Sequence, residues 1–111
     1  MADFRQSEIV SLATTVGSRE DARQLAAGLV EQRLAACVQV DLAVESHYRW
    51  EGRQCADAEV RLTVKTAPER LGALLAWLEG HHPYELPQLV WQVMPASQAY
   101  AAWVRSEVGA V

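Results

Sequence analysis

Two adjacent histidines, His81 and His82, are the residues of this chain that most directly suggest chemistry. They follow an apolar segment of helical spacing and precede Pro83, so we expect them where a helix ends. Imidazole suits copper and zinc, but a histidine near a helix C-terminus is also favoured by the helix dipole alone. Spacing by itself favours a solvated pair. Because adjacent side chains rarely point the same way, we expect one ring, more than both, to hold a given ion.

The two cysteines are a second kind of candidate ligand. Cys37 follows Leu34 and two alanines, at the point where a helix gives way to a strand. A free cysteine is among the most buried residue types, so the pattern favours a small core residue, although an accessible thiolate would bind Cu(I) or Zn(II). Cys55 lies just past a hairpin turn, too far from Cys37 for a disulfide within one chain.

The sequence offers no clear set of catalytic residues. It contains no Gly-rich phosphate loop, no nucleophile elbow and no spacing typical of a Ser-His-Asp triad. The polar face of the hairpin holds charges of both signs, which is typical of a solvated or interfacial ladder on a sheet. These residues are Glu45, Arg49, Glu59, Arg61 and Lys65. We therefore expect neither a catalytic centre nor an organic cofactor, with a small hydrolase or isomerase as a weaker alternative.

The elements that must position these residues follow from apolar periodicity, which alternates along the chain between about 3.6 and two. Ser18 and Ser97 are placed to cap helices, and Thr66, with Pro68 in the first turn, is expected to begin the second helix. Gly80 is expected to end that helix. The predicted order is a strand at 8–15, a helix at about 18–34, strands at 38–50 and 58–65, a helix at 66–80, a strand at 89–94 and a last helix from Ser97.

The segment from Val38 to Trp50 predicts one long strand with an apolar and a polar face. Its even positions are Val38, Val40, Leu42, Val44, Ser46, Tyr48 and Trp50. Unbroken, this arm would span about 43 Å, whereas a domain of this size has a radius of gyration near 13 Å. The hairpin tip, with Tyr48 and Trp50, is therefore expected to overhang its own subunit and to be covered by another copy of the chain.

This order of elements predicts one domain, residues 1–111, of the α+β class. The order β-α-β-β-α-β, followed by a C-terminal helix, is that of the ferredoxin-like split β-α-β sandwich, an antiparallel sheet with both helices on one face.

Composition narrows the class of partner. The net charge is −4 and no segment concentrates Lys or Arg, which argues against nucleic-acid binding. No apolar run approaches the roughly 20 residues of a membrane helix, and the N-terminus lacks the pattern of a signal peptide. We expect a cytoplasmic protein with no membrane partner.

Several blocks of the sequence, in order and at matching spacing, resemble the CutA divalent-cation-tolerance family. They are residues 34–38 (LAACV), 48–52 (YRWEG), Glu59-Val60, Lys65-Thr66 and 82–87 (HPYELP). The resemblance extends from about Ile9 to Trp103. It implies a tight homotrimer joined by the long hairpins, a role in tolerance to copper and other divalent cations, and copper binding in some members. Thr14 occupies the position at which some members have a cysteine that partners the paired histidines.

From these observations the expected metal ligands are His81 and His82, with Cys37 weaker, and the expected mechanism is binding, possibly coupled to another protein. The residues expected at a subunit interface or a cleft between subunits are Tyr48, Arg49, Trp50, Glu59, Lys65 and Tyr84. One alternative is a regulatory trimer that binds a small anion or metabolite near Lys65, Arg49 and Trp50. Another is a scaffold whose effect on metal tolerance is indirect.

Overall fold

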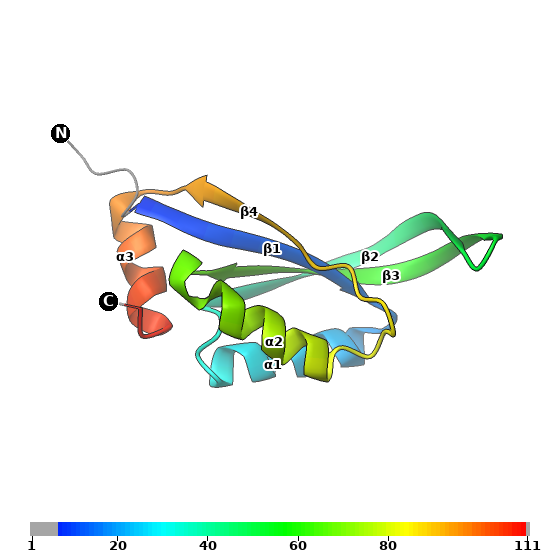
Figure 1. Ribbon diagram of the computed structural model, residues 1–111, viewed down its shortest axis with the longest axis horizontal. Coiled ribbons are helices and arrows are strands. Elements are labelled where there is room, and N and C mark those ends of the chain that lie inside the picture. Colours follow the sequence, from blue (N-terminus) through cyan, green and yellow to red (C-terminus); the bar gives the residue numbers. More distant parts are fainter. Residues whose placement is uncertain (1–6, 111) are drawn as a thin grey trace.

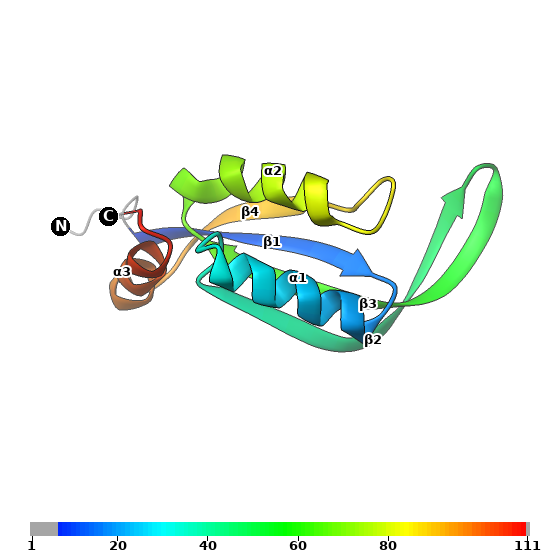
Figure 2. The same ribbon diagram turned by 90° about the horizontal axis from the view of Figure 1, so that it is seen from below.

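The computed structural model describes residues 7–110, which form one four-stranded sheet and three α-helices. The strands lie in the order β2-β3-β1-β4 and every neighbouring pair is antiparallel. Helices α1 and α2 cover one face of the sheet side by side, and α3 packs at one end (Figures 1 and 2). The elements are β1 (Glu8–Val16), α1 (Arg19–Glu31), β2 (Cys37–Trp50), β3 (Arg53–Thr66), a 3-10 turn η2 (Pro68–Arg70), α2 (Leu71–His81), β4 (Val90–Pro95) and α3 (Gln98–Glu107). The α+β class and the expected element order are confirmed.

The main core lies between the sheet and the two helices. Leu12 of β1 and Val64 of β3 are completely buried against Leu29 of α1 and Leu74 and Leu78 of α2. Buried residues recur at every second position in β1 and β3 and at every third or fourth position in α1 and α2, so each element places one face against the other layer.

Helix boundaries follow the expected caps at two of three helices. Ser18 Oγ accepts a hydrogen bond from the Asp21 backbone N–H at 3.1 Å, and Ser97 Oγ accepts one from Tyr100 N–H at 3.2 Å. The expectation for α2 is wrong at both ends. Thr66 is the last residue of β3, because it pairs with Val10 of β1, and the chain enters α2 through η2. Gly80 is an interior residue, since α2 continues to His81.

The long hairpin of β2 and β3 projects beyond the rest of the molecule, as expected (Figure 1). The subunit measures 52 × 27 × 23 Å and its radius of gyration is 15.0 Å, above the roughly 13 Å of a compact domain of this length. Glu51 and Gly52 form the turn, both with positive φ (49° and 77°), the conformation that two-residue hairpin turns favour.

The expectation of one apolar face along β2 is wrong, because the strand contains a bulge. Val40 pairs with Leu62, but the next paired residue is Ala43, opposite Val60. Asp41 and Leu42 therefore stand together opposite a single residue of β3, and Leu42 is 82% exposed. A bulge of this kind moves every later side chain to the other face of the strand.

The consequence is that the apolar series of β2 is divided between two faces. Val40 lies beside the buried Leu62, on the face that the helices cover. Beyond the bulge Tyr48 pairs with Cys55 and Trp50 with Arg53, and directly paired residues point to the same side of an antiparallel sheet. The aromatic residues of the hairpin therefore lie on the opposite face from Val40.

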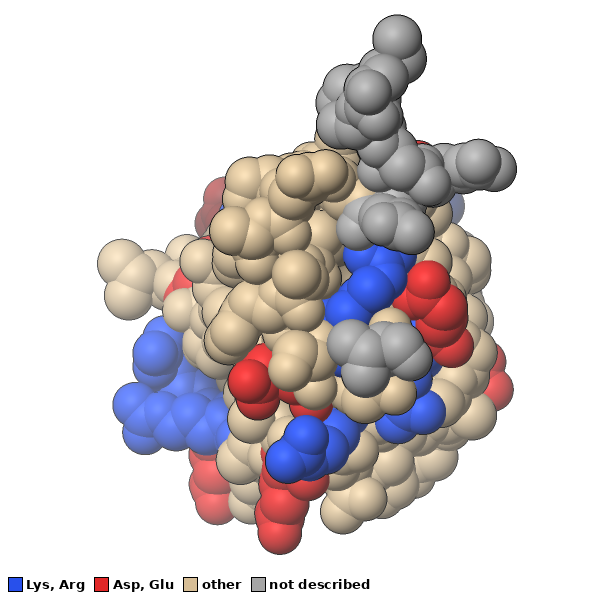
Figure 3. All heavy atoms as spheres, turned by 90° about the vertical axis from the view of Figure 1, so that its left-hand side faces the viewer, with Lys and Arg blue, Asp and Glu red and all other residues tan. Residues whose placement is uncertain are grey.

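The end of the molecule that carries α3 has a surface of mixed charge, with basic and acidic residues interspersed among uncharged ones (Figure 3). None of the helices within residues 7–110 combines the length and the apolar character needed to cross a bilayer.

Candidate functional site

His82 is anchored to β1 at the end of α2. Its Nε2 atom lies 2.9 Å from Thr14 Oγ1, and its Nδ1 atom lies 3.1 Å from the backbone N–H of Tyr84. An amide N–H can only donate, so Nδ1 accepts and, in the neutral ring, the proton is on Nε2. Nε2 therefore donates to Thr14. Both nitrogens of His82 are occupied within the subunit.

The surroundings of His82 favour the neutral ring. Desolvation lowers the pKa of His82 below its ordinary value of 6.5, against the opposing effects of the Thr15 backbone and the carboxylates of Asp21 and Glu59. Burial penalises the charged imidazolium more than these groups stabilise it.

His81 has a different environment, on the outer surface of α2. Its ring stacks on the indole of Trp77, with centroids 4.0 Å apart and planes at 11°. Its Nδ1 lies 2.7 Å from the Trp77 carbonyl oxygen. A carbonyl can only accept, so Nδ1 carries the proton and the lone pair of the neutral ring is on Nε2. This is the arrangement in which histidines usually bind metals, because the backbone bond fixes both ring orientation and tautomer.

Cys37 lies away from both histidines. Cys37 is half-buried at the start of β2, paired with Lys65, which in turn pairs with Ser11 of β1. Thr14 is three residues further along β1, about 10 Å at 3.3 Å per residue, so Cys37 and His82 do not meet within one subunit. Within residues 7–110 no three His, Cys, Asp or Glu side chains come together as a metal site.

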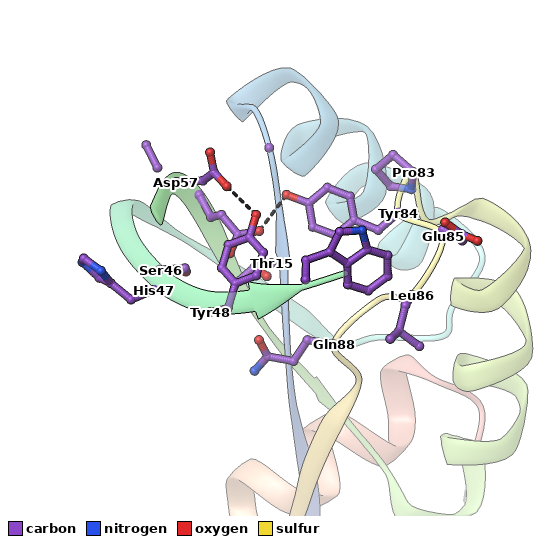
Figure 4. A pocket seen from close by; sticks show the side chains of 14 residues that line it. Thr15, Ser46, His47, Tyr48, Asp57, Pro83, Tyr84, Glu85, Leu86 and Gln88 are labelled. Atoms are coloured by element: carbon purple, nitrogen blue, oxygen red, sulfur yellow. Dashed lines mark hydrogen bonds between the residues drawn. The ribbon is translucent and has the colours of Figure 1, made fainter. Parts of the chain in front are cut away.

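A cleft of about 830 Å³ lies between the hairpin and the loop that follows α2. Two phenol–carboxylate pairs line it. The Tyr84 hydroxyl of the loop donates to Glu59 Oε2 of the hairpin at 2.6 Å, and within the hairpin the Tyr48 hydroxyl donates to Asp57 Oδ2 (Figure 4). The lining residues are Thr15, Gly17, Ser46, His47, Tyr48, Trp50, Asp57, Ala58, Glu59, Pro83, Tyr84, Glu85, Leu86 and Gln88.

The two pairs influence each other. The hydrogen bond to Asp57 is the largest cause that raises the pKa of Tyr48, to about 12, and the charge of Glu59 contributes. Burial and the bond to Glu59 raise the pKa of Tyr84, with further contributions from Tyr48 and Asp57. Both phenols therefore remain protonated donors at neutral pH.

The structure brings only some of the expected cleft residues together. Tyr48, Trp50, Glu59 and Tyr84 line the cleft. Arg49 pairs with Gln54 near the hairpin tip, on the other face from Trp50. Lys65 lies eleven residues along β3 from Gln54, about 36 Å if extended, and donates to Gln39 at 3.1 Å.

Asp57 is a cleft residue that sequence reasoning missed. It is two residues before Glu59, so the two carboxylates share one face of β3. The period-two spacing of Asp57 and Glu59 indicates from sequence that they share a strand face. That this face lines a cleft with Tyr48 and Tyr84 is seen only in the tertiary structure, where the loop after α2 lies beside the hairpin.

Comparison with known proteins gives one consistent result. The family model described as "CutA1 divalent ion tolerance protein" matches residues 10–107. The "Divalent-cation tolerance protein CutA" of Thermus thermophilus is 38% identical over 96 residues, which cover 86% of this chain and 93% of that protein. The structure of CutA from Synechococcus elongatus superposes with a TM-score of 0.86 at 40% identity, over 92% of this chain and 91% of the other. A chloroplastic CutA of Arabidopsis thaliana is 33% identical over 83% of this chain and 51% of its own length.

Proposed function

This chain belongs to the CutA1 divalent ion tolerance family, and on that basis we propose that it is a homotrimeric, cytoplasmic protein that acts by binding copper or another divalent cation, without catalysis. The observation that carries the metal assignment is the state of His81. Its ring is exposed, its tautomer is fixed by the Trp77 carbonyl, and its Nε2 lone pair is unused among the described contacts. Nε2 imidazole is a good ligand for copper.

The sequence suggested both histidines as metal ligands, but the proposal assigns them different roles. His81 is the primary ligand, because His82 would have to break its contacts with Thr14 and Tyr84 before either nitrogen could bind a metal. Cys37 has no part in a site within one subunit. A single imidazole leaves the remaining coordination positions of the ion to water or to groups of another subunit.

The metal assignment is tested by titrating the tag-free protein with Cu²⁺ and counting bound ions by native mass spectrometry. Wild type should take up a fixed number of ions, a multiple of three per trimer. His81→Gln should lose this uptake, whereas His82→Gln and the matched surface variant His47→Gln should keep it. Uptake by His81→Gln equal to wild type would remove His81 from the proposal. A smear of weak adducts on wild type would mean that the metal effect is indirect.

The homotrimer is supported by apolar side chains that one subunit leaves exposed. The face of the sheet away from α1 and α2 has a hollow of about 410 Å³, in which Ala13 and Val90 lie beside polar residues and the Arg61–Asp41 ion pair. Val90 is 51% exposed and the bulge residue Leu42 82%. The projecting hairpin has the length to reach a neighbour. The strand order, with both helices on one face, supports the ferredoxin-like classification.

A charge on the open sheet face tests the assembly. Val90→Asp should weaken the trimer, because the carboxylate would be desolvated in the interface. Val30→Asp, on the outside of α1, is the matched control, since Val30 is 48% exposed. Sedimentation velocity at several concentrations measures both. A monomeric wild type, or equal dissociation of the two variants, would contradict this arrangement.

A further inference from the structure

We propose that the cleft between the hairpin and the loop after α2 is a second binding site, for a small organic cation of the ammonium type. Within one subunit Tyr48, Trp50 and Tyr84 form its aromatic walls, and Asp57 and Glu59 supply the counter-charge. The inference rests on a trimer that leaves this cleft open, because the hairpin that carries Tyr48 and Trp50 is also the part of the subunit proposed to reach a neighbour. The volume of about 830 Å³ is within the range of small-molecule sites.

The sign of the charge determines the class of ligand. Among the described residues that line the cleft, Asp57, Glu59 and Glu85 are acidic and none is Lys or Arg. Its remaining titratable base, His47, is already paired with Glu45 at 2.9 Å. A concave surface of one sign concentrates ions of the opposite sign. The cleft therefore selects a cation and disfavours the small anion that the regulatory alternative requires.

The phenol–carboxylate pairs prepare the site for such a ligand. Each phenol donates its only proton to a carboxylate, Tyr84 to Glu59 and Tyr48 to Asp57. The hydroxyls are consequently not available as donors to an incoming anion. The bonds also hold the rings in place beside the carboxylates, and Figure 4 shows the two hydroxyls converging from the hairpin and the loop. Aromatic faces next to carboxylates are the groups that recognise alkylammonium ions.

The same arrangement is poorly suited to a metal ion. Within residues 7–110 no three His, Cys, Asp or Glu side chains are clustered. One oxygen of each of the carboxylates of Asp57 and Glu59 already accepts a hydrogen bond from a tyrosine hydroxyl. Hard divalent cations need several oxygen ligands at close range, whereas an ammonium ion is satisfied by diffuse charge and aromatic faces. The site is independent of the proposed copper ligand, because His81 does not line the cleft.

Calorimetric titration of the assembled protein with choline tests the inference. The comparison ligands are the uncharged carbon analogue of choline, in which carbon replaces the quaternary nitrogen, and acetate. Choline should bind at least about tenfold more tightly than its neutral analogue, a difference of about 1.4 kcal/mol, and acetate should not bind. Equal binding of choline and its analogue, stronger binding of acetate, or no binding of choline would each overturn the proposal.

Variants assign the effect to the cleft. Glu59→Gln, which keeps the shape of the side chain, and Trp50→Leu should each weaken choline binding about tenfold or more. The matched controls are Glu79→Gln on α2 and Trp103→Leu on α3, where Trp103 is 43% exposed and Trp50 41%. Controls that weaken binding as much as the cleft variants would contradict the assignment. Copper uptake should survive Glu59→Gln, and choline binding should survive His81→Gln, so failure of one proposal is distinct from failure of the other.

Discussion

Thr14 and His82 are 68 residues apart in the chain, yet Thr14 Oγ1 lies 2.9 Å from His82 Nε2. Thr14 is completely buried in β1 and the ring of His82 is partly buried at the end of α2. The contact joins the helix layer to the sheet, and the Tyr84 N–H, which donates to Nδ1, holds His82 in the Nε2–H tautomer.

Thr14→Val should destabilise the protein. The valine has the same shape but cannot accept the proton of His82, and the loss of a hydrogen bond of this kind costs about 1 kcal/mol. Urea unfolding at one fixed protein concentration measures the change. Nitrogen-15 NMR of the imidazole should show the same Nε2–H tautomer in the variant, because the Tyr84 N–H still donates to Nδ1, but a shifted Nε2 resonance. An unchanged free energy of unfolding together with an unchanged Nε2 chemical shift would show that the contact is not a hydrogen bond of consequence.

Thr66→Val should have the opposite effect. Thr66 is also completely buried, but its Oγ1 has no hydrogen-bond partner among the described residues. Replacing an unpaired buried hydroxyl by a methyl group removes a desolvation penalty, so we expect a gain of about 1 kcal/mol in the free energy of unfolding. The same urea titration gives the value. A loss equal to that of Thr14→Val would mean that a water or another group satisfies the hydroxyl.

Acid should destabilise the fold through His82. Its folded-state pKa lies below the ordinary 6.5 because of desolvation, so the unfolded chain binds the proton more tightly. The contribution of the neutral ring is therefore fully present above about pH 6.5 and is lost as pH falls through the folded-state pKa. His82→Gln, which retains an amide donor without titrating, should show a shallower decline in unfolding free energy on acidification. Equal slopes for the two proteins would contradict this prediction.

Gly28→Ala should destabilise the protein despite the better helix propensity of alanine. A Cβ atom at Gly28 would lie 2.8 Å from Trp77 Cζ2, in the contact between α1 and α2. Moving the indole costs about 1 to 3 kcal/mol, more than the propensity gain of about 1 kcal/mol. Because His81 stacks on Trp77, the chemical shifts of the His81 ring should move as well. Gly72→Ala on α2, where an added Cβ meets nothing within 4 Å, is the control and should stabilise the protein.

The sequence predicted those features that depend on neighbours along the chain. The caps at Ser18 and Ser97, the turn at Glu51-Gly52 and the periodicity of each element are local, and they were sufficient for the α+β class. The family resemblance came separately, from blocks of sequence. The bulge in β2 was not predictable in this way. Val40, Leu42 and Val44 continue the apolar alternation without a break, and only pairing with β3 shows that Leu42 is displaced.

The two buried threonines illustrate the same division. Each is a β-branched residue with a hydroxyl, which suits both a strand and the start of a helix. From sequence alone Thr66 was predicted to begin a helix, whereas it is the last residue of β3. Pairing of Thr66 with Val10 decided its position, and the approach of α2 to β1 decided that Thr14 has a partner. Likewise, the sequence blocks that resemble the family pointed to the histidines and the aromatic residues of the hairpin. The acidic lining of the cleft was found only in the tertiary structure, where the loop after α2 lies beside the hairpin. Local periodicity determines what each segment becomes, whereas strand register and the meeting of distant side chains depend on how the segments pack against one another.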